Sequence, residues 1–341
     1  MNVQSILPAW LAQSYMRQFA ATVLVVLVVV AGAGLFIQGM VSEELEHDTQ
    51  NEMQTVAELQ SNTFDQWVEE NEEIVRLLSG LEGVEGDEST AIAQLAEEQE
   101  QLPETIQTIY LVDRQSGTVL ESTGDVREGT TLDGLGVNWI DSSLTEMNRE
   151  ETLVSQGFRR GDDELVAFAS TGSADRAVVM TVDASERAES FSDPIEGGFT
   201  QVVDSHGVVE FAEDDAAVLA EYRGGTDSEA LQRGLAGESG VVEEDGYLVA
   251  YAPVAGTDWV VLSHAPKSEA YHLVSTIQQD ILILIGLVTA GFVAMGLTIG
   301  RGTVRALKDL EATAQELEDG NLEVSVETDR TDEIGQLYEA F

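Results

Sequence analysis

Two long apolar runs without a formal charge frame a much more polar middle. Residues 18–42 and 281–300 contain no Asp, Glu, Lys or Arg, and these runs are 25 and 20 residues long. A helix rises about 1.5 Å per residue, so either run is long enough for a hydrocarbon core of about 30 Å. The pattern predicts transmembrane helices at 19–42 and 281–300. The alternatives are a cleaved signal peptide for the first run and a buried core helix for the second.

The charges beside these two runs predict their orientation. Arg17 precedes the first run and Asp280 precedes the second. Acidic residues follow the first run, whereas the second is followed by Arg301, Arg305 and Lys308. Because basic residues favour the cytoplasmic side, we expect 1–18 and 301–341 in the cytoplasm and 43–279 outside the cell.

The segment after the first run has the pattern of a long amphipathic helix. Its apolar residues recur mostly three or four positions apart, or at sums of these steps, and neither Gly nor Pro interrupts it before Gly80. This apolar stripe consists of Leu45, Met53, Val56, Leu59, Phe64, Trp67, Ile74 and Leu78. A second, shorter helix is expected within 81–102, with Ile92 and Leu95 on its apolar side and Pro103 at its end.

From about residue 104 the pattern changes to short strands separated by turns, and it occurs twice. Thr108–Asp113 and Thr118–Ser122 predict a β-hairpin, and the same strand–Asp–turn–strand form recurs 91 positions later within 201–211. A second pair of strands is expected within 165–183, and its counterpart within 248–262. An internal repeat of this size predicts two similar α+β modules in tandem.

Residues 301–341 have the pattern of two helices joined by an extended connector. The first helix ends at Gly320 and has an apolar seam of Leu307, Leu310, Ala314 and Leu317. The second helix begins with the motif Asp332-Glu333-Ile334-Gly335. This order resembles a HAMP linker, a parallel dimeric relay beneath receptor membrane spans, although Ala306 stands where that family usually has Pro. The resemblance implies that the relay residues are Leu307, Leu310, Leu317, Gly320, Asp332, Glu333 and Gly335.

The composition narrows the class of protein further. The chain has 63 acidic residues against 16 basic ones, a formal net charge of −47. Such a charge repels itself at low ionic strength, but a Debye length of about 3 Å in molar salt screens most of the repulsion. The composition therefore favours a protein of a salt-loving organism, and it argues against nucleic-acid binding, which requires basic patches. A disordered acidic tail is disfavoured because 43% of the chain is hydrophobic.

The sequence offers no catalytic motif. The chain has no Cys, so neither a disulfide nor a Cys-ligated metal can form. Its four His are not at metal-ligand spacing, and no Walker loop, nucleophile elbow or zinc-peptidase motif occurs. We therefore expect no enzymatic activity, no cofactor and no metal.

The long helix followed by two repeated modules resembles the double Cache family of extracytoplasmic sensors over about 43–275. The resulting fold class is a membrane protein of the α+β type, with two transmembrane helices, tandem PAS-like modules and cytoplasmic HAMP helices. The resemblance implies that a first module, at 104–190, is membrane-distal and holds a small-molecule ligand. A second module, at 198–270, would be membrane-proximal.

The same resemblance suggests ligand-binding residues. Family members that bind amino acids use an Arg, a Trp two positions later and an Asp at the end of the last strand. Trp139 and Asp183 match the last two, but Val137 stands at the Arg position. Arg127, Arg159 or Arg160 could substitute for the missing Arg. The candidate ligand-binding residues are therefore Trp139, Asp183, Arg127, Arg159 and Phe168.

Over its whole length the chain resembles haloarchaeal transducers, which are methyl-accepting chemotaxis or phototaxis receptors. The second helix of the HAMP-like segment has barely begun at Phe341, so we expect the sequence to be the N-terminal part of a longer receptor. The resemblance implies a homodimer, and a chemotaxis histidine kinase and coupling protein bound by the missing part. Two alternatives stay open: a phototaxis transducer driven by a sensory rhodopsin, and the N-terminal half of a sensor histidine kinase.

Overall fold

The computed structural model describes most of the chain outside the C-terminal segment. The described residues are 15–139, 144–148, 151–161, 163–172, 175–188, 191, 195–300, 305, 308–309, 311–312 and 314–316. The chain divides into two compact units, one of which is Glu46–His272; the other combines Met1–Leu45 with Leu273–Phe341. The expected relay residues lie outside the described residues; they are Leu307, Leu310, Leu317, Gly320, Asp332, Glu333 and Gly335.

Helix α2 (Tyr15–Ser79) contains the predicted amphipathic helix. Its buried face includes Met53, Ala57, Phe64, Trp67, Val68, Val75 and Leu78. Leu59, which the periodicity put on this face, is instead 66% exposed. The buried face passes at this point through Ala57, Gln60 and Ser61, so apolarity alone misplaced the stripe by a fraction of a turn. At the C-terminal end, the Gly80 N–H donates to main-chain carbonyls of the last turn.

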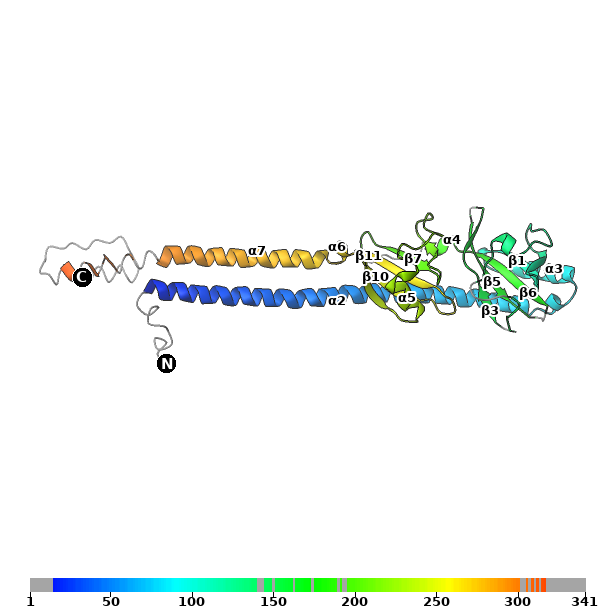
Figure 1. Ribbon diagram of the computed structural model, residues 1–341, viewed down its shortest axis with the longest axis horizontal. Helices are drawn as coiled ribbons and strands as arrows, with labels where there is room; N and C mark the ends of the chain where they lie inside the picture. The colour runs from blue at the N-terminus through cyan, green and yellow to red at the C-terminus, as the bar shows by residue number, and fades with distance from the viewer. Residues whose placement is uncertain are drawn as a thin grey trace. The chain divides into compact units, whose positions relative to one another are not determined.

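The first module is an antiparallel sheet with helix α3 (Glu88–Gln99) beside it. Its strands are β1 (Ile106–Asp113), β2 (Thr118–Ser122), β3 (Thr152–Val154), β4 (Phe158–Arg160), β5 (Asp163–Ser170) and β6 (Arg176–Asp183). The strand order is β2-β1-β6-β5-β3, and β4 also pairs with β5. The predicted hairpin is confirmed, since β1 and β2 pair directly. Figure 1 shows β1, β6 and β5 together in this sheet.

The second module is a five-stranded antiparallel sheet with three short helices near it. Its strands are β7 (Phe199–Val203), β8 (Val209–Ala212), β9 (Gly240–Glu244), β10 (Tyr247–Pro253) and β11 (Val260–Pro266). The helices are α4 (Ser185–Ala188), α5 (Glu229–Leu235) and α6 (Lys267–Ala270). The strand order is β8-β7-β11-β10-β9.

The two sheets have the same topology, as the sequence repeat predicts. The order β2-β1-β6-β5-β3 corresponds strand for strand to β8-β7-β11-β10-β9. Asp113 and Asp204 occupy equivalent hairpin turns, and each carboxylate accepts backbone N–H groups of its own turn. Gly117 and Gly207 have φ of +64° and +76°, which explains why each turn contains a Gly.

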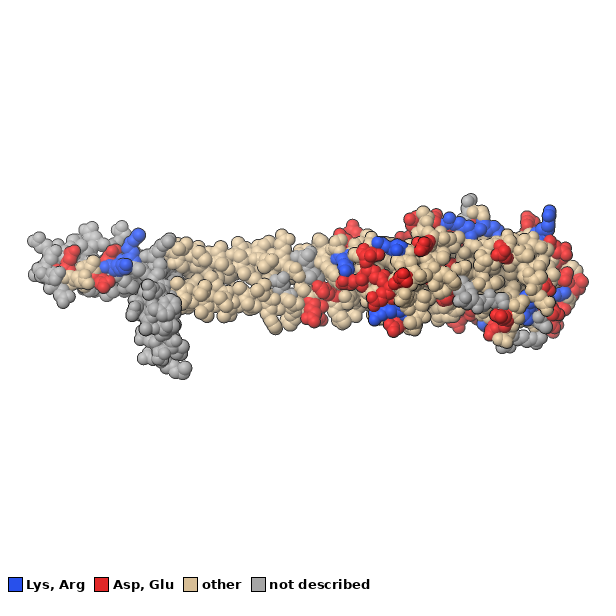
Figure 2. All heavy atoms as spheres, viewed as in Figure 1, with Lys and Arg blue, Asp and Glu red and all other residues tan. Residues whose placement is uncertain are grey.

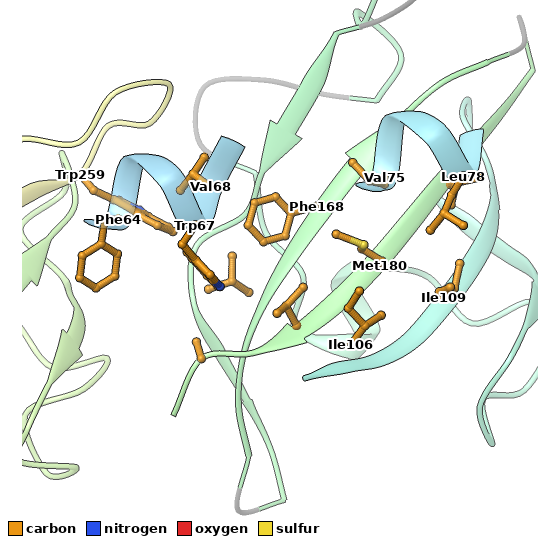
Figure 3. Packing of buried hydrophobic residues seen from close by; sticks show 14 of the residues in the cluster. Phe64, Trp67, Val68, Val75, Leu78, Ile106, Ile109, Phe168, Met180 and Trp259 are labelled. Atoms are coloured by element: carbon orange, nitrogen blue, oxygen red, sulfur yellow. The ribbon is translucent and has the colours of Figure 1, made fainter. Parts of the chain in front are cut away.

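Helix α2 supplies core residues to both sheets (Figure 3). The Trp67 ring lies edge-on to Phe168 of β5, with centroids 5.5 Å apart, and stacks on Trp259, with centroids 6.5 Å apart. Trp67 also lies edge-on to Phe211 of β8, at 5.9 Å. One indole therefore contacts the first and second modules, and large apolar side chains of both sheets are buried around a single helix.

The other unit is built from the N-terminal part of α2 and from helix α7 (His272–Met295), which is followed by a π-helical turn at Gly296–Gly300. The two helices pack together, because a Cβ added at Gly34 would lie 2.7 Å from Ile285 Cδ1. Ser42 Oγ accepts a hydrogen bond from Gln278 Nε2 at 3.3 Å. Among the described residues, Thr276–Thr298 is long and apolar enough to cross a membrane, whereas the apolar helical stretch Ala20–Phe36 is shorter.

Candidate ligand-binding site

The sheet of the first module has a second buried face, opposite the one that packs on α2. Strand alternation sends Tyr110 and Val112 of β1, and Ala167 and Ala169 of β5, to this face. Segments between β2 and β4 cover it with Leu132, Val137, Leu144 and Met147, and Phe158 of β4 packs in the same cluster. Of these residues of β1 and β5 only Ala167 and Ala169 are small, and small side chains under a cover of larger ones can leave room for a small molecule.

Arg160 is a cation at the edge of this face. Because Phe158 and Arg160 are two positions apart in β4, they lie on the same side of the strand, whereas Arg159 lies on the other. Arg160 Nη1 donates to Tyr110 Oη at 2.5 Å, and its guanidinium carbon lies 5.6 Å from the Phe158 ring centroid. Arg160 Nη2 is buried and has no hydrogen-bond partner among the described residues.

An unpartnered guanidinium nitrogen at a buried position is unfavourable, since burial of a charged donor without an acceptor carries the full desolvation penalty. A ligand carboxylate or other anion would supply the acceptor that Arg160 lacks. Tyr110 Oη, already bound to Arg160, would fix the position of the guanidinium. The pair Arg160–Tyr110 can therefore recognise an anionic group.

Trp139 lines a cavity of about 260 Å³ at the hairpin end of the same face. Other residues around this cavity are Arg114, Gly117, Thr131, Val137, Asn138 and Leu144. Arg114 donates to the carbonyl oxygens of Leu144 at 3.0 Å and Met147 at 2.6 Å, and so ties the covering segment to the end of β1. The half-buried Trp139 also forms an isolated antiparallel bridge with Ser155.

The remaining candidates from the sequence have other surroundings. Asp183 is half-buried, and its Oδ1 accepts from Ser185 N–H at 3.0 Å and Oγ at 2.6 Å, which caps α4. Arg159 pairs with Glu164 at 2.7 Å, and Arg127 is exposed. Phe168 is fully buried against Trp67, on the opposite face of the sheet, and so is a core residue.

The sequence offered Arg127, Arg159 and Arg160 as substitutes for the Arg that is missing at position 137. The structure places Arg160 on the buried side of β4, whereas Arg159 and Arg127 are exposed. The signal was present in the alternation of Phe158-Arg159-Arg160, since Phe158 marks the buried side of β4. That signal could be used only if β4 was known to be a strand, and three residues between turns do not reveal one.

One group of His and carboxylate side chains in the described part of the chain has the spacing of metal ligands. Ligand atoms of Asp204, His206 and Asp258 all lie within 4.8 Å of one another. Both carboxylates already accept hydrogen bonds, Asp258 from Ser205 Oγ at 2.6 Å and Asp204 from Gln156 Nε2 at 2.7 Å. These hydrogen bonds hold the β7–β8 turn in place and account for the closeness of the three side chains. We therefore assign no metal to the cluster.

Comparison with known proteins identifies the class. The family model "HAMP domain" matches residues 298–341. The ligand-binding domain of the Pseudomonas fluorescens chemoreceptor CtaA, solved with L-isoleucine, has a related fold, with a TM-score of 0.50 over 68% of this chain and 98% of that one, at 14% identity. The fold is therefore the α+β fold of chemoreceptor ligand-binding domains, and a HAMP domain follows it in the chain.

Two curated relatives from Halobacterium salinarum match almost the entire chain. Transducer protein Htr18 is 30% identical over 100% of this chain and 42% of its own length. Transducer protein BasT is 32% identical over 99% of this chain and 43% of its own length. The chain thus spans about two fifths of the length of these relatives. Over nearly its whole length, the chain is similar to these haloarchaeal transducer proteins.

Proposed function

We propose that the chain is the sensing part of a transmembrane chemoreceptor that binds a small molecule outside the cell and relays its occupancy to a cytoplasmic HAMP domain. The observation that carries this proposal is the order of parts in one chain. A chemoreceptor-type sensor fold comes first, an apolar helix at Thr276–Thr298 follows, and the HAMP match begins at residue 298. The membrane-length helix leads directly into the HAMP match, so a displacement of this helix would be passed on to the relay.

The proposed topology has two crossings, with both termini in the cytoplasm and 43–279 outside. The second crossing is Thr276–Thr298, and the first is the N-terminal part of α2 that packs against it. Both helices have large apolar side chains exposed: Leu24, Val25, Val28, Val29, Leu282, Leu284 and Leu287 are 56–66% accessible. Figure 2 shows a charge-free surface on these helices and abundant acidic side chains on the sensor unit. A charge-free apolar surface of this kind requires lipid or protein around it.

The proposed ligand is a small anion or zwitterion held in the first module. Arg160 and Tyr110 would bind its anionic group. Trp139 would contact its apolar part, although the cavity that Trp139 lines is not lined by Arg160 or Tyr110. Asp183, at the end of β6, remains the candidate for an amine, although it now caps α4. The L-isoleucine bound by CtaA is a zwitterion of the proposed class, while the similarity between the two proteins establishes only the fold.

The proposed mechanism is a shift between two arrangements of a homodimer. A ligand moves such an equilibrium only through its different affinity for the two states. The HAMP helices would repack in response, and the part of the receptor beyond residue 341 would pass the change to a chemotaxis histidine kinase and its coupling protein. The relay residues expected in the HAMP segment belong to this proposal.

Calorimetry on the full chain in lipid nanodiscs at molar KCl tests the ligand site. The panel contains L-isoleucine, the other common amino acids, succinate and malate. We expect at least one compound to bind and Arg160→Ala to weaken its binding by about tenfold or more, as expected for loss of a charge-assisted hydrogen bond. The matched control is Arg159→Ala, which removes the neighbouring exposed Arg and should leave affinity unchanged. Absence of binding across the panel, or equal affinities in Arg160→Ala and the parent, would contradict the proposed site.

A further inference from the structure

The short segment Ser155–Gly157 is fixed to the sheet of the first module. Ser155 is 1% exposed, and its N–H donates to the Ala167 carbonyl at 2.8 Å. In return, Ala167 N–H donates to Ser155 Oγ at 2.8 Å. These reciprocal bonds anchor the segment on β5 at Ala167, a residue of the covered face that carries the candidate ligand site.

The same segment is joined to the cover of that face. Trp139 forms its antiparallel bridge with Ser155, and Gln156 N–H donates to the Asn138 carbonyl at 3.0 Å. Asn138 and Trp139 both line the 260 Å³ cavity. The backbone at Asn138 and Trp139 is therefore bonded directly to the backbone at Ser155 and Gln156.

On its other side, the segment contacts two buried carboxyl groups of the second module. Gln156 Nε2 donates to Asp204 Oδ2 at 2.7 Å, and Gly157 N–H donates to Glu210 Oε2. Asp204 is fully buried and Glu210 is 3% exposed. Asp204 begins the β7–β8 turn and Glu210 lies near the start of β8, so one segment of the first module contacts both sides of the turn end of this hairpin.

The contact at Gly157 is close, whereas nearby the two modules leave open space. A Cβ added to Gly157 would lie 2.7 Å from Glu210 Oε2, so only Gly permits this approach. A cavity of about 660 Å³, lined by Thr152–Val154 of β3 and by 253–259 of the second module, leaves room for movement. Polar contacts between the modules here come from Gln156 and Gly157, and also from Arg159, whose Nη2 donates to the Asp215 carbonyl at 2.6 Å.

We propose that Gln156 and Gly157 are the coupling residues through which a change at Trp139 reaches the β7–β8 hairpin of the second module. The inference rests on the proposed function, because it assigns a regulatory output to the proposed ligand pocket. Gln156 acts through Asp204 and is a positioning residue. The apolar contacts of Trp67 also join the modules, but they lie on the opposite face of the first sheet, away from Trp139.

Hydrogen exchange measured by mass spectrometry on the full chain in nanodiscs tests this coupling without a ligand. The readout is the exchange of peptides covering 201–212, in the parent, Trp139→Ala, Gln156→Ala and the double variant. We expect Trp139→Ala to raise exchange in 201–212 by about tenfold, the effect of about 1.4 kcal/mol. In the Gln156→Ala background, in which exchange is already raised, Trp139→Ala should add no further increase.

The matched control is Gln99→Ala. Gln99 Nε2 donates to the carbonyls of Ile106 and Gln107, both at 3.2 Å, within the first module alone. Trp139→Ala should therefore still raise exchange about tenfold in the Gln99→Ala background. A merely structural role of Gln156 would raise exchange in 201–212 but leave the effect of Trp139→Ala additive.

Additive effects in the Gln156→Ala background, or no effect of Trp139→Ala on 201–212, would overturn the inference. Gln156→Glu is a second variant, which places a carboxylate against Asp204 and should likewise abolish transmission from Trp139. Because the cycle uses no ligand, its outcome is separate from that of the calorimetry. Binding without coupling overturns only this inference, and coupling without binding overturns only the proposed ligand site.

Discussion

The hydroxyl of Tyr222 and Nε2 of His264 lie 2.9 Å apart in the core of the second module. His264 stacks on Phe199, with ring centroids 4.3 Å apart, and the Tyr247 ring lies edge-on to it at 6.1 Å. His264 Nδ1 is buried without a hydrogen-bond partner among the described residues. Aromatic rings and a phenol therefore pack around a buried imidazole, an environment that favours the neutral ring.

His264 makes the second module sensitive to acid. Burial, followed by the nearby Arg223, lowers the pKa of His264 from 6.5 to about 4. Below pH 6.5 the imidazole of His264 is protonated in the unfolded chain, but in the folded chain it stays neutral until about pH 4. The free energy of unfolding therefore falls as pH decreases through this window. His264→Gln keeps an acceptor for Tyr222 and should flatten the decline between pH 6.5 and 4. Denaturant unfolding followed by tyrosine and tryptophan fluorescence measures it, and an unchanged slope in the variant would contradict the assignment.

Glu210 makes the stability of the second module fall as pH rises, the opposite of the effect of His264. Burial raises the pKa of Glu210 from 4.5 to about 8, against the lowering effect of the Gly157 N–H, and the carboxylates of Asp204 and Asp258 add to the rise. The folded chain keeps a proton that the unfolded chain releases above pH 4.5, so this contribution to stability is lost as pH rises towards 8. Glu210→Gln retains the acceptor for Gly157 and should remove that loss. The same denaturant unfolding, measured from pH 4.5 to 9, tests this. If the free energy of unfolding of Glu210→Gln fell with pH as steeply as that of the parent, the raised pKa of Glu210 would be contradicted.

Trp67 should be the most costly single truncation on α2. Its indole contacts Phe168, Phe211 and Trp259, so removal opens a cavity bordered by both sheets. We expect Trp67→Ala to lower the free energy of unfolding by about 3–5 kcal/mol. The control is Leu59→Ala on the same helix, where a side chain that is 66% exposed should change stability by about 0.5 kcal/mol or less. Comparable losses for the two variants would refute the assigned buried face of α2.

Salt should stabilise the folded chain strongly. Acidic side chains cover much of the sensor unit in Figure 2, and the formal net charge is −47. Raising KCl from 0.1 to 1 M shortens the Debye length from about 10 to about 3 Å and screens the repulsion between these charges. Thermal unfolding midpoints should therefore rise continuously over this range. A midpoint independent of KCl would show that repulsion among the acidic residues does not limit stability.

The architecture was largely predictable because its signals are periodic. The apolar stripe of α2, the two Asp-centred hairpins and the paired long strands appear in the sequence as steps of three to four or of two. The strands that were missed, β3, β4 and β9, are short or begin at Gly, and short elements acquire their structure from tertiary pairing. Helix α5 has only seven residues and gave too little periodicity to predict.

The site was less predictable because it depends on which face each strand buries. Trp139, predicted to bind the ligand, lines a cavity and stays a candidate, while Phe168 lies on the opposite face. Arg160 and Arg159 differ by one position, which in a strand reverses the direction of the side chain. The bonds of Gln156 and Gly157 to Asp204 and Glu210 join residues about fifty positions apart, and no local pattern in the sequence indicates such a contact.

The central claim, a sensor outside the membrane and a HAMP relay inside, is tested most directly by labelling single Cys residues. The natural chain has no Cys, so Ser239→Cys in the second module and Lys308→Cys in the HAMP segment each report one position. Both residues are exposed. In intact cells of a haloarchaeal host, a membrane-impermeant maleimide should label Ser239→Cys, and it should label Lys308→Cys only after lysis. Labelling of Lys308→Cys in intact cells, or protection of Ser239→Cys until lysis, would contradict the account.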